Sequence, residues 1–319
     1  MLTQLEKIFK PQSIAAIGIS EREGTVGHVL LKNLLAGGFQ GKLFPVNPKH
    51  DEIQGVKCYA NVKEIPQQVD LAVIAAPAKA VPKVVEECGE AGIGGLIIIS
   101  AGFKEAGEEG QMMLDQILAS CRKYKMRLIG PNCLGIINPT LGINATFANR
   151  MALPGNIAFI SQSGALCASI LDWSLEQSVG FSSFVSIGSM VDVGFAELID
   201  YFGTDPATSC MLIYMESLTD ARKFMSAARA FARSKPIIIL KAGKSQEGGK
   251  ATMSHTGSLA GNDAAFDAAF QRAGCIRVEK ISQLFDCAQA LAMQPRPSGN
   301  RLAILTNAGG PGVLATDYL

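Results

Sequence analysis

The residues best suited to chemistry in this sequence surround His255. Glycines flank this histidine on both sides, and Lys241, Lys244 and Lys250 precede it. Imidazole is a nucleophile at neutral pH, while glycine backbones and lysine side chains favour a bound anion. We therefore predict that a phosphoryl group binds in the loop that carries His255. The alternative is an ordinary surface histidine.

Two predicted elements would position His255. The aliphatic run 235–241 is typical of a buried parallel strand, and residues 257–273 have a helical pattern. The histidine then lies in a strand-to-helix loop, where Thr256 and Gly257 would present backbone N–H groups at the positive end of the helix. This arrangement predicts a phosphate-binding site.

A second anion site is predicted at Ser163, Gly164 and Ala165, which follow an apolar strand and open a helix. Their N–H groups should point outward from the helix start. Ser163 could equally serve only as the N-cap of that helix. In a neighbouring loop, Gly188 and Ser189 are expected to line the same pocket. Asp192 could cap the next helix and is expected to have a mainly structural role.

Glu216 is the predicted partner of His255. It ends the apolar strand 210–215, so its carboxylate should lie at the sheet edge that carries the histidine loop. A carboxylate bonded to one imidazole nitrogen fixes the tautomer and leaves the other nitrogen as the nucleophile. The alternative is a solvated acid at a strand end.

The first part of the chain predicts a pocket for a nucleotide-like cofactor. The loop 18–27 contains glycines but lacks the G-x-G-x-x-G spacing of a dinucleotide site. Lys49 follows the second strand, where NAD would need an acid, and a lysine there would meet a ribose phosphate of coenzyme A or, less favourably, of NADP. Small residues follow the third, fourth and fifth strands and leave the carboxyl edge of the sheet open to an extended ligand. Each of these loops could instead be an ordinary tight turn between a strand and a helix. The predicted cofactor-binding residues are Gly18, Ser20, Arg22, Gly24, Val26, Gly27, Asn47, Lys49, Ala76, Pro77, Ser100, Ala101, Gly102, Asn132 and Cys133.

Length and composition limit the classes of function. The chain has 319 residues, enough for two domains, and its net charge of +1 favours neither nucleic acid nor membrane as a partner. The N-terminus lacks a signal-peptide pattern, and no apolar run approaches the ~20 residues that span a bilayer, so we expect a cytoplasmic protein. The eight cysteines show no C-x-x-C pair, and we predict no resident metal.

Apolar strands alternate with helical segments from residue 13 onward, which predicts an α/β fold with two doubly wound parallel sheets. The pattern lapses between 138 and 154, where we place a domain boundary. Residues 301–310 echo 156–165 and predict the first strand and part of one helix of a third unit. Either the chain is a fragment of a longer protein, which the linker-like residues 295–299 favour, or the last strand docks onto the second unit. We expect this tail to be poorly ordered or paired with a neighbour. The predicted strands are 13–20, 42–47, 71–76, 95–100, 127–131, 156–161, 181–187, 210–215, 235–241 and 275–278, and the predicted helices are 25–37, 79–90, 108–124, 165–179, 195–203, 220–234, 257–273 and 282–293.

Three motifs carry a resemblance to a known family. They are Gly-Pro-Asn-Cys at 130–133, Ser-Gln-Ser-Gly at 161–164 and Ser-His-Thr-Gly-Ser-Leu-Ala-Gly at 254–261. With the order of the units, they resemble the nucleoside-diphosphate-forming acyl-CoA synthetases. This group includes ADP-forming acetyl-CoA synthetase and the α subunit of succinyl-CoA synthetase, and the resemblance covers essentially the whole chain.

The resemblance implies a Rossmann-like CoA-binding domain at 1–138, a flavodoxin-like domain at 150–295 and the start of a truncated third α/β unit at 300–319. It implies that His255 is a phosphohistidine, supported by Glu216, and that the start of the helix at Ser163 holds phosphate. An acid, CoA and ATP would then give acyl-CoA, ADP and phosphate through an acyl phosphate.

The family needs an ATP-grasp domain or subunit for ATP, ADP and Mg, and nothing in this sequence resembles one. The chain alone is therefore expected to bind CoA and phosphate, and a small acyl substrate, without turning over ATP. Two alternatives stay open. One is the CoA-sensing region of a protein lysine acetyltransferase with a fused acetyltransferase domain, and the other is an NADP-binding oxidoreductase domain.

Overall fold

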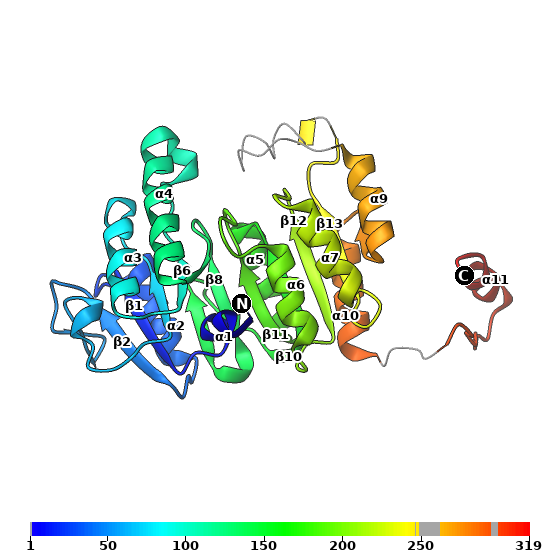
Figure 1. Ribbon diagram of the computed structural model, residues 1–319. Helices are drawn as coiled ribbons and strands as arrows, with labels where there is room; N and C mark the ends of the chain where they lie inside the picture. Colours follow the sequence, from blue (N-terminus) through cyan, green and yellow to red (C-terminus); the bar gives the residue numbers. More distant parts are fainter. Residues whose placement is uncertain (1, 246, 249–261, 295–298) are drawn as a thin grey trace.

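The computed structural model describes residues 2–245, 247–248, 262–294 and 299–319. Two α/β units lie side by side, each with a sheet covered by helices on both faces (Figure 1). The predicted fold class is confirmed. In the described part of the chain no helix combines the length and the apolar character that crossing a bilayer would require.

The first unit has five parallel strands in the order β2-β1-β5-β6-β7. Its central strands are buried along their whole length, as expected when helices cover both faces of a parallel sheet. Helices α1 and α2 pack on one face, and α3 and α4 on the other. A short hairpin of β3 (Glu52–Ile53) and β4 (Val56–Lys57) follows β2. The other elements are β1 (Ser13–Ile17), β2 (Lys42–Val46), β5 (Leu71–Ile74), β6 (Gly95–Ile98), β7 (Arg127–Ile129), α1 (Leu2–Phe9), α2 (Val26–Ala36), α3 (Val81–Glu90) and α4 (Gly107–Tyr124).

The second unit has seven strands in the order β14-β13-β12-β10-β11-β8-β9. Strands β10 to β14 are parallel, and their order is that of a flavodoxin-like sheet. Helices α5 and α10 pack on one face, and α6, α7 and α9 on the other. The elements are β10 (Pro154–Ser161), β11 (Phe181–Ser186), β12 (Cys210–Met215), β13 (Ile237–Lys241), β14 (Ile276–Val278), α5 (Gly164–Glu176), α6 (Phe195–Thr204), α7 (Ala221–Phe231), α9 (Asp263–Ala273) and α10 (Ile281–Met293).

An antiparallel hairpin extends the second sheet where no strand was predicted. It consists of β8 (Gly135–Asn138) and β9 (Ile143–Thr146), and β8 pairs antiparallel with β11. The Pro and Gly residues between the strands form a turn rather than a break, and strands of four residues are too short for a clear alternation. β8 therefore belongs to the second sheet although it precedes residue 139. The division into 1–138 and 150–295 stays a prediction.

The segment that follows β11 joins the two units by running beside β7. The N–H of Ser189 donates to the carbonyl of Pro131 at 2.9 Å, and the N–H of Val193 donates to the carbonyl of Leu128 at 3.1 Å. Gly188 has a φ of 53°, and a Cβ there would lie 2.3 Å from the Pro131 carbonyl oxygen. Only glycine permits this close approach of the units.

Asp192 has a structural role, as expected, but it links the two units and does not cap the next helix. Its carboxylate accepts hydrogen bonds from Arg127 Nε at 2.9 Å and from the Leu128 N–H at 2.8 Å. The N-cap of α6 is instead Gly194, whose N–H donates to Glu197 Oε2. Glu197, three residues after the N-cap, accepts this bond as in a capping box. Asp192 precedes the N-cap by two residues and therefore does not occupy the capping position.

We predict that Asp192→Ala lowers the free energy of unfolding by about 2–4 kcal/mol, because it leaves the largely buried Arg127 guanidinium without its carboxylate. The control is Asp172→Ala, which breaks an exposed ion pair with Arg150 and should cost less than about 1 kcal/mol. Urea unfolding measures both. Equal effects of the two changes would contradict the structural role of Asp192.

The tail forms the predicted helix but not the predicted strand. Residues 301–306 form no strand, and only α11 (Gly309–Asp317) is regular. The segment has no neighbouring strand within the described residues, and backbone groups of a lone strand gain nothing from an extended conformation. Figure 1 shows α11 apart from both sheets. Apolar side chains of this segment, such as Leu305 and Tyr318, are exposed.

Candidate functional site

A cavity of about 1180 Å³ lies between the two units, at the carboxyl ends of their parallel strands. Open α/β sheets bind ligands at this edge. The first unit contributes the loops that follow β5, β6 and β7, and the second contributes the start of α5 and the end of β12. The predicted residues that line the cavity are Val26, Ala76, Pro77, Ser100, Ala101, Asn132, Cys133, Ser163, Gly164, Ala165, Gly188 and Glu216.

The other predicted residues of the first unit do not line this cavity, and several hold the β1 loop together. Gly18 has a φ of 80°, and a Cβ on Gly27 would lie 2.3 Å from its carbonyl oxygen, so both glycines permit a tight loop. Asn47 Nδ2 donates to the Ile19 carbonyl at 2.7 Å. The residues outside the lining are Gly18, Ser20, Arg22, Gly24, Gly27, Asn47, Lys49 and Gly102.

Helix α5 begins with an N-cap that uses one of the predicted donors. Ser163 Oγ accepts from the Leu166 N–H at 3.2 Å, while the Ser163 N–H donates to Ser161 Oγ at 3.0 Å. The expectation that the Ser163 N–H points outward is therefore wrong. The N–H groups of Gly164 and Ala165 belong to the first turn and have no acceptor within the helix. These two donors can face an anion in the cavity.

Glu216 is held in place by Gln162, which the sequence analysis did not select. Gln162 Oε1 accepts from the N–H groups of Glu216 at 2.6 Å and Ser217 at 2.9 Å, and its Nε2 donates to Ser217 Oγ at 3.2 Å. All three residues are buried and line the cavity. An amide at the end of a buried strand, inside the Ser-Gln-Ser-Gly motif, was the available signal.

Two of the lysines expected to attract an anion bind protein groups instead. Lys241 Nζ donates to the carbonyl oxygen of Glu216 at 2.9 Å, and burial lowers the pKa of this ammonium group. Lys244 forms an ion pair with Glu279 at 2.6 Å. Lys241 therefore ties β13 to the end of β12, beside the Glu216 side chain.

The histidine site itself lies outside the described residues. This applies to His255, Thr256, Gly257 and Lys250. The described part of the helix predicted over 257–273 begins at Asp263, with Asn262 as its N-cap. Glu216 lies at the strand end expected for it, and its contact with His255 stays a prediction.

Cys133 lines the cavity but is a poor nucleophile. Its Sγ donates to the Ile98 carbonyl at 3.3 Å, and burial raises the pKa of the thiol to about 12. The thiol is therefore protonated at neutral pH, whereas the thiolate is the reactive form. We assign it to packing around a ligand.

The β8–β9 hairpin supplies cavity residues that no sequence pattern indicated. Phe147 follows β9, lines the cavity and is 37% exposed. Asn33 of α2 holds this loop, because its Nδ2 donates to the carbonyls of Thr146 at 2.9 Å and Ala148 at 2.7 Å. These cavity residues could be identified only from the pairing of the β8–β9 hairpin with the second sheet. Ser189, which was predicted to line the pocket with Gly188, also lines the cavity. The other lining residues that were not predicted include Lys104, Glu105, Asn149, Ser217 and Thr219.

Comparison with known proteins agrees with this architecture. Residues 12–139 match a family described as a CoA binding domain, and residues 154–291 match a succinyl-CoA ligase like flavodoxin domain. The chain is 46% identical over 317 residues to the alpha subunit of acetate–CoA ligase [ADP-forming] I from Pyrococcus furiosus, covering 98% of this chain and 69% of that subunit. It is 48% identical over 313 residues to acetate–CoA ligase [ADP-forming] I from Archaeoglobus fulgidus, covering 98% of this chain and 45% of that protein.

A solved structure gives the same result. The dinucleotide-forming acetyl-coenzyme A synthetase 1 of Ca. Korarchaeum cryptofilum, in complex with phosphate and ADP, superimposes with a TM-score of 0.93 at 40% identity, covering 98% of this chain and 68% of that one. The fold and the cavity thus define the CoA-ligase portion of an acid–thiol ligase. The chain belongs to the family of ADP-forming acetate–CoA ligases.

Proposed function

We propose that this chain binds coenzyme A and a small acyl group in the cavity between its units, and that it carries the acyl-transfer and histidine-phosphorylation steps of an ADP-forming acyl-CoA ligase. ATP and ADP, with Mg, would bind to an ATP-grasp domain or partner subunit. The division into a CoA-binding domain at 1–138, a phosphohistidine domain at 150–295 and a third unit from residue 300 belongs to this proposal, as does a cytoplasmic location.

The proposed reaction has two steps in this chain, cleavage of the thioester by phosphate and transfer of the phosphoryl group to His255. A phosphate oxygen attacks the thioester carbonyl, the C–S bond breaks, and CoA leaves as a thiol after taking up a proton. An imidazole nitrogen of His255 then attacks the phosphorus of the acyl phosphate, and the carboxylate leaves. Gly164 and Ala165 would bind the phosphate oxygens, and Glu216 would orient the imidazole.

The observation that supports this function is a cavity that both units line. The loops after β5, β6 and β7 and the start of α5 face the same space, so a thioester bound by the first unit can meet an anion bound by the second. Holding two reactants in one space is a large part of such catalysis. The same cavity is lined by Glu216.

Cofactor choice separates this proposal from an oxidoreductase. Calorimetry should show CoA binding at least about tenfold more tightly than NADPH, because the loop 18–27 lacks the G-x-G-x-x-G spacing that a dinucleotide needs. Ala101→Trp should abolish CoA binding by filling the cavity, whereas Ala119→Trp, exposed on α4 outside the lining residues, should leave it unchanged. Tighter binding of NADPH would overturn the proposal.

Chemistry separates the proposal from a sensor. Wild-type chain should release free thiol from acetyl-CoA with arsenate in place of phosphate, because the acyl arsenate hydrolyses and pulls the exchange forward. Release must depend on arsenate and be absent in Ala101→Trp. Binding of CoA without any thiol release, also after addition of an ATP-grasp subunit, would leave a CoA-sensing module as the function.

A further inference from the structure

The ammonium group of Lys241 contacts three separate pieces of the second unit. Its Nζ donates to the carbonyl oxygen of Glu216, just beyond the end of β12, and to that of Ala242, just beyond the end of β13. It also lies 4.6 Å from the centre of the Phe266 ring, near the start of α9. In the sequence, His255 lies between Ala242 and Phe266. One side chain therefore connects both ends of the segment that contains His255 with the residue proposed to orient the histidine.

The main chain of Glu216 is held by side chains on both of its polar groups. Its N–H donates to Gln162 Oε1 at 2.6 Å, and its carbonyl oxygen accepts from Lys241 Nζ at 2.9 Å. The register between β12 and β13 ends at the pair of Met215 and Lys241, so Glu216 lies just outside the paired part of the sheet. Gln162 and Lys241 together set the direction in which this residue leaves β12.

Burial makes the hydrogen bonds of Lys241 costly to break. The residue is half-buried, and burial lowers the pKa of its ammonium group, while the nearby carboxylates of Asp263 and Glu216 oppose this shift. A charged group that is taken out of water costs free energy unless its donors are paired. A shift of Glu216 or Ala242 away from Nζ would leave a donor unpaired, so both carbonyl groups are held close to it.

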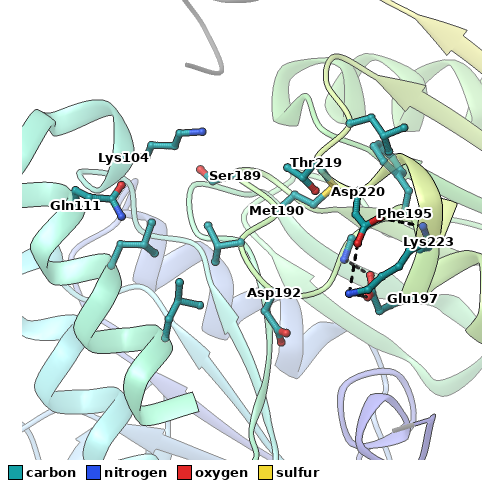
Figure 2. Close-up of a pocket in the computed structure, with 16 residues that line it drawn as sticks. Lys104, Gln111, Ser189, Met190, Asp192, Phe195, Glu197, Thr219, Asp220 and Lys223 are labelled. Carbon is teal, nitrogen blue, oxygen red and sulfur yellow. Dashed lines mark hydrogen bonds and ion pairs between the residues drawn. The ribbon is translucent and has the colours of Figure 1, made fainter. Parts of the chain in front are cut away.

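An exposed lysine of the same unit gives the contrast. Lys223 lies beside the carboxylates of Glu197 and Asp220 (Figure 2). Ion pairs between exposed side chains do little to hold a structure, because both partners can move and water screens them. Lys241 instead binds main-chain carbonyl groups, so it holds the backbone itself.

The start of α9 is also fixed from β14. Asp263 is the first residue of α9, and its Oδ1 accepts from Arg277 Nη2 at 2.6 Å. The side chain of Arg277 is only 8% exposed, so this ion pair is more than a surface contact. Lys241 and Arg277 thus hold α9 at the point where the chain returns to the second sheet.

We infer that Lys241 is a positioning residue for phosphoryl transfer to His255, because it sets the end of β12 that carries Glu216 relative to both ends of the segment that contains the histidine. This inference rests on the proposed function. Lys241 does not line the cavity in which the thioester would be cleaved. It should therefore act on the transfer to His255 and not on the cleavage of the thioester.

The test compares the two steps in Lys241→Met, which keeps most of the hydrocarbon stem and removes the ammonium group. The rate at which acetyl phosphate with radioactive phosphorus labels the chain should fall about 10–100-fold, because a displacement of about 1 Å at a reacting group can cost this much. Arsenate-dependent thiol release from acetyl-CoA should change less than about twofold, since the cavity is left intact.

Lys235→Met is the matched control. Lys235 precedes β13, and its Nζ donates to the carbonyl oxygens of Phe202 at 2.9 Å and Asp205 at 2.6 Å. The change therefore also removes a positive charge that is bonded to two main-chain carbonyls, but at the opposite end of the strand. Both rates should stay at the wild-type level. Equal slowing of the labelling in Lys235→Met and Lys241→Met would overturn the inference, because a general loss of stability would then explain both.

The two steps also separate this inference from the proposed function. Labelling of Lys241→Met at the wild-type rate, or equal losses of labelling and thiol release, overturns the positioning role while the proposed function stands. If the wild-type chain takes up no label, the phosphohistidine step of the proposed function fails. Amide hydrogen exchange then decides on Lys241: the N–H groups of Glu216 and Ala242 should exchange at least about tenfold faster in Lys241→Met, and unchanged exchange overturns the role.

A second variant decides if Lys241→Met does not fold. Phe266→Leu removes the ring beside the ammonium group and keeps an apolar side chain at the start of α9. It should slow labelling about 2–10-fold and leave thiol release unchanged, because a cation–π contact of this kind is lost. Labelling of Phe266→Leu at the wild-type rate would overturn the inference.

Discussion

His255→Ala should take up no acid-labile, base-stable label from acetyl phosphate that carries radioactive phosphorus, whereas the wild-type chain should. A phosphoramidate on imidazole hydrolyses in acid and survives base, while an acyl phosphate on a glutamate is lost in base. The label therefore identifies the nucleophile as well as the transfer. The substitution removes the only group proposed to accept the phosphoryl, so we expect complete loss rather than a reduced rate.

The control for this experiment is His50→Ala. His50 is an exposed histidine in the first unit and should keep the full label. A wild-type chain that binds CoA but takes up no label would favour the sensor. Persistent label in His255→Ala would move the nucleophile to another residue, and base stability of that label would indicate another histidine.

The sheets could be predicted because long aliphatic runs report burial directly. Residues 95–98 and 237–240 are apolar throughout, which is typical of strands covered on both faces. The edge that carries the cavity followed from strand direction alone, and Ala76, Ser100, Asn132, Ser163 and Glu216 lie there. Local sequence therefore fixes which sheet edge a residue occupies.

The misses depend on pairings between distant residues. The β8–β9 hairpin exists because β11 offers an open edge, and Asp192 bonds across the unit boundary to Arg127. Whether the Ser163 N–H is free to bind an anion depends on the rotamer of Ser161, whose Oγ accepts from it. The spacing of residues in a sequence does not reveal that rotamer. Such features are properties of contacts, so a single sequence carries little information about them.

Gln162→Leu should slow histidine labelling about 100-fold, because the buried N–H groups of Glu216 and Ser217 lose their shared acceptor. Each unsatisfied N–H costs about 1–3 kcal/mol, and the strand end that carries Glu216 is free to move away. The dissociation constant for CoA should change less than about threefold, since the predicted CoA contacts lie in the first unit. Gln162 is thus a positioning residue, and a parallel rise in that constant would contradict this role.

Gln162→Glu distinguishes positioning from general stability through pH. A protonated glutamic acid can replace the amide, because its carbonyl oxygen can accept from both N–H groups and its O–H can donate to Ser217 Oγ. An ionised glutamate has no proton to donate to Ser217 Oγ, and it adds a second carboxylate beside Glu216. Burial and the neighbouring charge both raise the pKa of the introduced carboxyl above its ordinary value of about 4.3. The ratio of the histidine-labelling rate of Gln162→Glu to that of wild type should therefore approach one as the pH falls below that raised pKa. The ratio should decline as the pH rises through it. A ratio independent of pH, measured alongside wild type in the same buffers, would show that the amide only fills space.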